Sequence, residues 1–108
     1  MPSEEDQNPH QDDTGPGHPP WKVVIVDDDP DMQLLTRSLL RKLTFEGRSI
    51  QALSAHSGDE GVLLLREHPD TAVVLMDVMM EHDQAGLEAV RRIRQELNNW
   101  FVRIVLRT

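Results

Sequence analysis

Short runs of apolar residues alternate along the chain with segments of helical spacing. The runs at residues 22–26, 72–76 and 102–106 are rich in Val, Ile and Leu, and each is too short for a helix. A weaker run of the same length class lies at residues 49–55. Uninterrupted apolar runs of this length favour strands that are buried on both faces, as in a parallel sheet.

The segments between these strands predict helices at about 31–43, 58–67 and 86–97. Apolar residues recur three or four positions apart in the first helix, at Met32, Leu35, Leu39 and Leu43, and in the third, at Leu87, Val90, Ile93 and Leu97. The second is short and buries some of the residues from Val62 to Leu65. Asp29 or Asp31 can cap the first helix, with Pro30 in its first turn. Ser57 with Glu60 forms a candidate capping box for the second.

The order of elements is therefore strand, helix, strand, helix, strand, helix, strand. Such alternation with short connections predicts right-handed crossovers and an α/β fold with a doubly wound parallel sheet. In sheets of this kind ligands bind at the carboxyl ends of the strands. The residues that follow each strand are consequently the first candidates for a functional site.

Composition divides the chain into two parts. Residues 1–20 hold five acids, no Lys or Arg, and five of the seven prolines, so we expect a disordered acidic tail, with residues 21–108 forming one small domain. The whole chain has a net charge of −8 and no cysteine, which excludes disulfides and thiolate metal sites and disfavours nucleic-acid binding. It has neither a signal peptide nor an apolar run of membrane-spanning length. We expect a soluble cytoplasmic domain.

Acidic residues follow two of the apolar strands. Asp27 and Asp28 come directly after the first, Asp77 comes after the third, and the hydroxyl residue Thr108 lies just beyond the fourth. A single Asp after a strand is more often a helix cap, but acids after two parallel strands would meet at one edge. Carboxylates without His or Cys favour Mg²⁺ or Mn²⁺, and a carboxylate beside such an ion can become an aspartyl-phosphate.

Three segments resemble response regulator receiver domains: residues 23–30 (VVIVDDDP), 73–80 (VVLMDVMM) and 102–108 (VRIVLRT). The resemblance implies a flavodoxin-like sheet of strand order 2-1-3-4-5. It also implies that Asp77 is the phosphoacceptor and that Asp27 and Asp28 hold Mg²⁺ together with Asp77 and the backbone carbonyl of Met79. Thr108 would be the switch hydroxyl. The phosphoryl donor would be a sensor histidine kinase or a phosphotransfer protein.

The chain departs from the pattern of that family in three places. Glu81 stands where the family usually has Pro, and Gly86 comes one residue late. The sequence also ends at Thr108, before the fifth strand and its lysine, so we expect an incomplete domain whose output domain lies beyond Thr108. With the strand at 102–106 left as an open edge, we expect the isolated chain to be marginally stable or self-associating.

Two other functions remain open at this point. One is a Mg²⁺-dependent phosphohydrolase whose nucleophile is Asp27, since residues 27–31 have the Asp-x-Asp spacing of haloacid-dehalogenase-like enzymes. The other is a receiver-like interaction module that is never phosphorylated. The receiver hypothesis predicts a signalling domain rather than an enzyme, with phosphotransfer only to its own aspartate.

Overall fold

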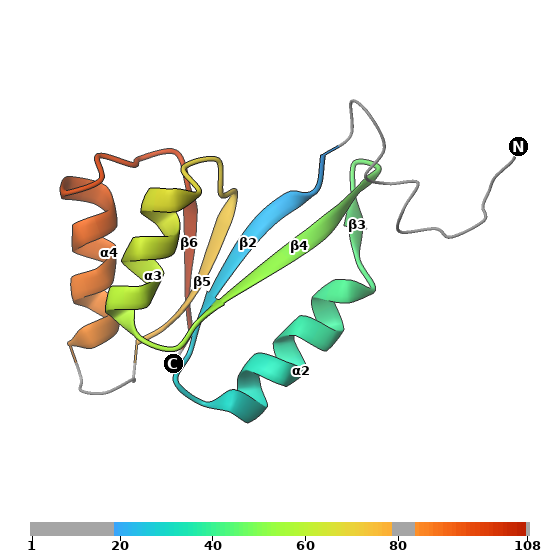
Figure 1. The fold of residues 1–108 in the computed structure, drawn as a ribbon, viewed down its shortest axis with the longest axis horizontal. Helices are drawn as coiled ribbons and strands as arrows, with labels where there is room; N and C mark the ends of the chain where they lie inside the picture. The colour runs from blue at the N-terminus through green and yellow to red at the C-terminus, as the bar shows by residue number, and fades with distance from the viewer. Residues whose placement is uncertain (1–18, 79–83, 108) are drawn as a thin grey trace, which may run out of the picture.

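The structure, a computed structural model, describes residues 19–78 and 84–107 of the chain. These residues form one five-stranded sheet and three helices (Figure 1). In chain order the elements are β2 (Trp21–Val26), α2 (Pro30–Arg41), β3 (Thr44–Phe45), β4 (Arg48–Ala55), α3 (Gly58–Glu67), β5 (Val73–Asp77), α4 (Ala85–Gln95) and β6 (Arg103–Arg107).

The sheet has the strand order β3-β4-β2-β5-β6. The strands β4, β2, β5 and β6 are parallel, and their register pairs Val26 with Met76 and Met76 with Leu106. The strand ends therefore meet along one edge of the sheet. Both the predicted parallel α/β fold and the strand order that the family resemblance implied are confirmed for the described strands.

The main core lies between the sheet and the helices α3 and α4, which are side by side in Figure 1. Alternate residues of β2 and β5 point to this side, because successive side chains of a strand face opposite ways. The buried residues of this core are Val24, Val26, Ala55, Val62, Leu65, Val74, Met76, Ala85, Ala89, Ile93 and Val102. The expected burial on both faces holds for the end of β2, whereas β6 is open, since Val105 and Leu106 are 48% and 49% exposed.

Helix α2 packs against the other side of the sheet, and it does so with polar residues. Gln33 and Thr36 are its buried side chains, whereas Leu35 and Leu39 are 52% and 56% exposed. The apolar stripe predicted for this helix exists, but within residues 19–78 and 84–107 nothing buries it. The helix predicted from the apolar spacing is confirmed, and its buried contacts are hydrogen bonds: the Gln33 amide donates to backbone carbonyls at the strand ends, and the Thr36 hydroxyl accepts from Arg107.

The short strand β3 was not predicted. It pairs antiparallel with the start of β4, as Thr44 with Ser49 and Phe45 with Arg48. Glu46 and Gly47, the two residues between, both have positive φ, 54° and 73°. This backbone is typical of the tight two-residue turns that join hairpin strands. Glu46 and Gly47 therefore form the turn of a β-hairpin between β3 and β4.

The predicted helix caps are confirmed. Asp29 caps α2 by accepting a hydrogen bond from the backbone N–H of Asp31 at 2.9 Å, and Pro30 occupies the first turn. Ser57 caps α3 by accepting from the N–H of Glu60 at 3.1 Å, while the Glu60 carboxylate accepts from the N–H of His56. The chain direction after β2 and β4 is therefore set by local polar contacts.

Helix length bears on whether the chain can span a membrane. A spanning helix needs about 20 apolar residues, and α2, with 12 residues, includes charged ones. Among the helices of the described residues, none is both long and apolar enough to cross a lipid bilayer.

The two sides of α4 give a direct test of this packing. Ile93 is fully buried between α4 and the sheet, and Leu87 on the same helix is 46% exposed. We expect Ile93→Ala to lower the free energy of unfolding by about 2–5 kcal/mol, because it leaves a cavity in the core. Leu87→Ala should change it by less than about 1 kcal/mol. Chemical denaturation of the two variants measures both values, and equal losses would contradict the placement of α4.

Candidate functional site

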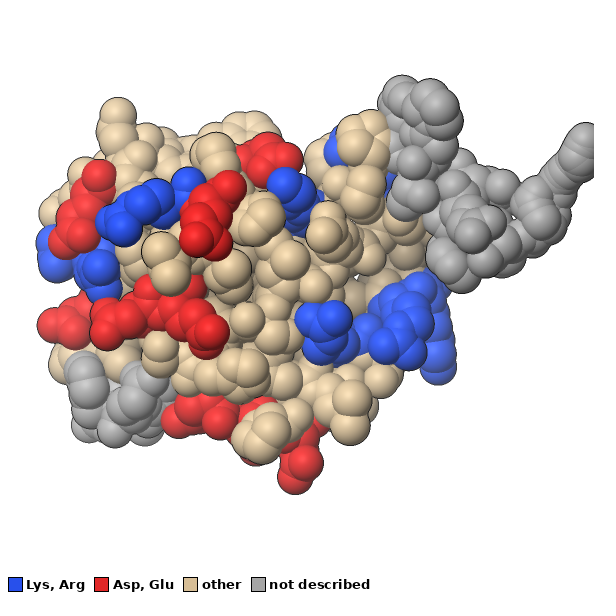
Figure 2. Space-filling model, in the orientation of Figure 1, with Lys and Arg blue, Asp and Glu red and all other residues tan. Residues whose placement is uncertain are grey.

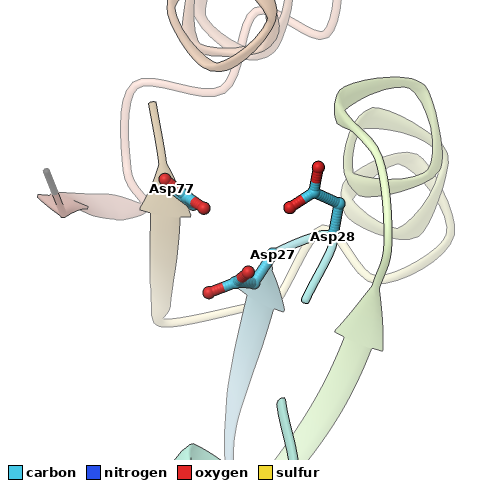
Figure 3. Close-up of side chains that lie close together, drawn as sticks. All are labelled: Asp27, Asp28 and Asp77. Atoms are coloured by element: carbon cyan, nitrogen blue, oxygen red, sulfur yellow. The ribbon is translucent and has the colours of Figure 1, made fainter. Parts of the chain in front are cut away.

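Three carboxylates meet at the carboxyl ends of β2 and β5. Asp27 and Asp28 directly follow β2, and Asp77 is the last residue of β5, the neighbouring strand. One oxygen from each side chain lies within 4.8 Å of the others, and Figure 3 shows the three side chains directed toward a common point. The sequence predicted this cluster from strand ends alone, and the structure brings its three members together.

The three carboxylates differ in exposure. Asp27 is 4% exposed, Asp77 is partly buried and Asp28 is exposed. Figure 2 shows acidic side chains gathered along the lower edge of the molecule, where α2 begins, with basic side chains further along toward the end of α2. The cluster is thus reached from solvent on an acidic edge, with Asp27 as its innermost member.

Asp27 is held by two donors. Its Oδ1 accepts from the backbone N–H of Asp29 at 2.9 Å, and its Oδ2 accepts from Nη2 of Arg107 at 2.9 Å. Burial raises the pKa of the Asp27 carboxyl above its ordinary value, and the charge of Asp77 adds to that rise. The N–H of Asp29 and the guanidinium of Arg107 oppose it. The site therefore disfavours the ionised form of Asp27 unless a further cation compensates its charge.

Gln33, a buried residue of α2, holds the end of β2 in place. Its Nε2 lies 3.0 Å from the carbonyl oxygen of Ile25, 3.1 Å from that of Asp27 and 2.8 Å from that of Ala55, and it donates to them. The amide group thereby joins α2 to the ends of β2 and β4. Sequence analysis missed this residue, because a Gln beside an apolar stripe looks like a solvent-facing position.

Gly86 fixes the end of β5. A Cβ atom at this position would lie 2.7 Å from the carbonyl oxygen of Asp77 and 2.7 Å from Cα of Val78, both backbone atoms that cannot turn aside. Only a residue without a side chain lets the start of α4 come so close to the strand end. The backbone of Val78 is held further by its N–H, which donates to the carbonyl of Arg107 at 3.1 Å.

Two predicted site residues, Met79 and Thr108, lie outside the described residues, so their expected roles stay predictions. The same holds for most of the predicted tail at residues 1–20, of which 1–18 are not described. Arg107, in contrast, was missed by sequence analysis although it contacts Asp27. Its signal was available, since the parallel register pairs Arg107 with Asp77 and so brings a cation to the same edge.

The donor set of the cluster suits a small hard cation. The ligand atoms on offer are carboxylate oxygens, which Mg²⁺ prefers, and the cluster contains no nitrogen or sulfur ligand. Oxygens bound to one Mg²⁺ lie at most about 4.2 Å apart, twice its usual bond length of about 2.1 Å. Separations within 4.8 Å therefore need only a small closure, and the residues present fit the ion.

Comparison with known proteins gives a consistent match. The family model described as the response regulator receiver domain matches residues 23–108. A curated relative, the 3'3'-cGAMP-specific phosphodiesterase 2 of Vibrio cholerae serotype O1, is 46% identical over 89 residues, which are 82% of this chain and 17% of the relative. The chain thus corresponds to a small part of that protein.

Solved structures agree with the family match. A chain in the CheX-CheY-BeF3-Mg+2 complex from Borrelia burgdorferi matches with a TM-score of 0.59 and 27% identity, over 81% of this chain and 60% of that one. A chain in the complex of the P1 domain of CheA3 with CheY6 from R. sphaeroides matches with a TM-score of 0.62 and 26% identity, over 81% and 62%.

The raised pKa of Asp27 predicts a pH dependence of stability in metal-free buffer. The folded state keeps a proton on Asp27 above the unfolded value of 3.8, so wild-type stability falls as pH rises through that interval. Asp27→Asn removes this loss. Its one amide oxygen can accept from the N–H of Asp29 in place of Oδ1, whereas the amide NH2 in place of Oδ2 cannot accept from Arg107. The melting temperature of this variant relative to wild type should therefore increase from pH 4 toward neutral pH.

Asp70 is the matched control with the opposite sign. The side-chain hydrogen bond from Lys22 holds the pKa of Asp70 below its ordinary value. Asp70→Asn should lose a little stability at neutral pH, and that loss should disappear as pH falls below the unfolded pKa. Thermal melts of both variants in EDTA measure the two trends, and parallel trends would contradict the assignment of Asp27 as a buried, strained carboxylate.

Proposed function

Because the chain belongs to the response regulator receiver domain family, we propose that Asp77 accepts a phosphoryl group from a phosphohistidine donor. The observation that carries this proposal is the position of Asp77 at the end of β5, with one oxygen within 4.8 Å of oxygens of Asp27 and Asp28. A nucleophile needs neighbouring groups that hold the charge of the phosphoryl oxygens. Asp77 is partly exposed, so a donor can approach it.

The reaction at Asp77 is one exchange of bonds. A carboxylate oxygen of Asp77 forms a bond to phosphorus, and the bond between phosphorus and the donor's imidazole nitrogen breaks. The leaving imidazole keeps the bonding electron pair and takes up a proton from solvent. The product is an acyl phosphate on the protein, so the chemistry we propose for this domain is transfer to its own side chain.

Mg²⁺ is the cofactor we propose, held by Asp27, Asp28 and Asp77. When bound, it supplies positive charge next to the phosphoryl oxygens. The neighbouring strand ends hold the three carboxylates in place for it, with Gln33 and Gly86 restraining the backbone on either side. The carbonyl of Met79 and the hydroxyl of Thr108, which lie outside the described residues, complete the proposed site as metal ligand and switch group.

The partners follow from the same proposal. A sensor histidine kinase or a phosphotransfer protein would supply the phosphoryl group, and the structural match to a chain crystallised with the P1 domain of CheA3 supports this. The phosphohistidine is made from ATP inside the cell, so we propose a cytoplasmic location. The 46% identity to part of a phosphodiesterase supports an output domain of that class in the whole protein.

The structure favours Asp77 over Asp27 as the nucleophile. Asp27 is 4% exposed and both of its oxygens already accept hydrogen bonds, one from Asp29 and one from Arg107. A phosphohydrolase that uses Asp27 would have to bring its substrate to a carboxylate that is almost fully buried. The alternative of an interaction module that is never phosphorylated requires that neither carboxylate reacts.

Phosphorylation with a small donor separates these functions. Incubation with acetyl phosphate and Mg²⁺ should place a hydroxylamine-sensitive phosphoryl group on Asp77, located by mass spectrometry of peptides. Asp77→Asn keeps the size of the side chain and removes the nucleophile, so the label should vanish. A label that survives in Asp77→Asn and disappears in Asp27→Asn would make Asp27 the nucleophile. No label on any variant that still binds Mg²⁺ would favour the interaction module.

Metal binding gives a second prediction. Titration of the chain with Mg²⁺ should shift the backbone amide signals around Asp27 and Val78, and Asp28→Ala should weaken the affinity by about tenfold or more. Asp31→Ala is the control, because Asp31 is exposed on the first turn of α2 and outside the cluster. Equal affinities for wild type and Asp28→Ala would contradict the proposed metal site.

A further inference from the structure

Arg107 reaches across the sheet to the acidic cluster. It is the last residue of β6, and β5 lies between β6 and β2 in the sheet. Its Nη2 donates to Oδ2 of Asp27 at 2.9 Å, and its Nη1 donates to Oγ1 of Thr36 at 3.2 Å. One guanidinium therefore connects the end of β6 with the end of β2 and with helix α2.

The two donors on Asp27 are not equally free to move. The N–H of Asp29 belongs to the backbone of the residue that caps α2, so its position is fixed by the start of that helix. Arg107 contributes the other donor from a long side chain that is 29% exposed. A cation that needs Oδ2 of Asp27 can thus displace Arg107 more readily than it can displace the Asp29 backbone.

Arg107 also has a second contact that does not depend on Asp27. If Nη2 leaves the carboxylate, Nη1 can keep its hydrogen bond to Thr36, a residue that is 7% exposed and packed against the sheet. The guanidinium would then rest on α2 beside solvent. The contact with Thr36 would thus keep the guanidinium next to the cluster after it leaves Asp27.

We propose that Arg107 is an internal counter-cation, which occupies the cluster through Asp27 in the metal-free protein and releases Asp27 when a divalent cation binds. This proposal rests on the metal site of the proposed function and adds a residue that regulates it. Binding of the cation and the Arg107–Asp27 contact oppose each other, so each weakens the other by the same factor. Occupancy of the cluster is thereby transmitted to Arg107 at the end of β6.

The experiment compares Mg²⁺ affinity in the chain of residues 1–108 and in three variants, with backbone amide shifts of Asp28 and Val78 as the readout. Arg107→Gln should bind Mg²⁺ about tenfold more tightly than wild type, a typical size for coupling between two sites. Arg107→Lys keeps the positive charge and a partner for Asp27, so it should remain close to wild type. Arg103→Gln, at the far end of the same strand, is the charge-matched control and should not change the affinity.

The direction of the change decides the question. Equal or weaker Mg²⁺ binding by Arg107→Gln would overturn the proposal, because a residue that only positions Asp27 would assist the metal. If wild type and Arg107→Gln both fail to bind Mg²⁺, the proposed metal site is wrong and this inference falls with it. Binding by both with equal affinity overturns this inference alone.

The displacement of Arg107 can also be measured by NMR in the wild-type protein, without any substitution. The Nε–Hε and guanidinium NMR signals of Arg107 report whether it is hydrogen-bonded to a carboxylate. We expect these signals to shift toward those of a solvent-exposed arginine as Mg²⁺ saturates the cluster, in parallel with the amide signal of Asp28. Guanidinium signals that stay unchanged at saturation would overturn the displacement of Arg107.

Discussion

Repulsion among three carboxylates is the constraint around which this domain is organised. Parallel strands with aligned registers place Asp27, Asp28 and Asp77 at one edge of the sheet, with oxygens within 4.8 Å. Like charges at such separations are unfavourable unless donors or cations compensate them. The surrounding structure supplies part of that compensation through the backbone N–H of Asp29 and the guanidinium of Arg107, which both donate to Asp27. The remaining negative charge favours a divalent cation.

Two residues restrain the strand ends that carry the cluster. Gln33 ties three carbonyl oxygens of the strand ends to α2, and Gly86 brings α4 into contact with the backbone of Asp77. Neither residue takes part in the proposed chemistry. Because both restrain the strand ends in the folded protein, the repulsion among the carboxylates is overcome during folding. The site is therefore preorganised before any cation or phosphoryl group binds.

The parallel sheet and the acidic cluster could be predicted from the sequence, whereas the buried side of α2 and the contact of Arg107 could not. The strands β2 and β5 are short apolar runs that end in acids, so the parallel sheet and the meeting of Asp27, Asp28 and Asp77 followed directly. The apolar spacing predicted helix α2 but not which of its residues are buried, because the buried contacts of Gln33 and Thr36 are hydrogen bonds. Arg107 was missed because its contact with Asp27 spans 80 positions along the chain.

The contact between Gly86 and Asp77 has a consequence for how the connection between them can vary in length. Val78 follows the end of β5 and Gly86 lies in the first turn of α4, so the two ends of the connection between these elements are fixed against each other. Doubling the length of such a loop costs only about 0.6 kcal/mol of closure entropy. The extra residue before Gly86 is therefore nearly neutral, and a peptide inserted in this connection would lie close to the end of β5, and so to Asp77, without shifting β5 or α4. The position is a natural attachment point for an engineered reporter of the state of Asp77.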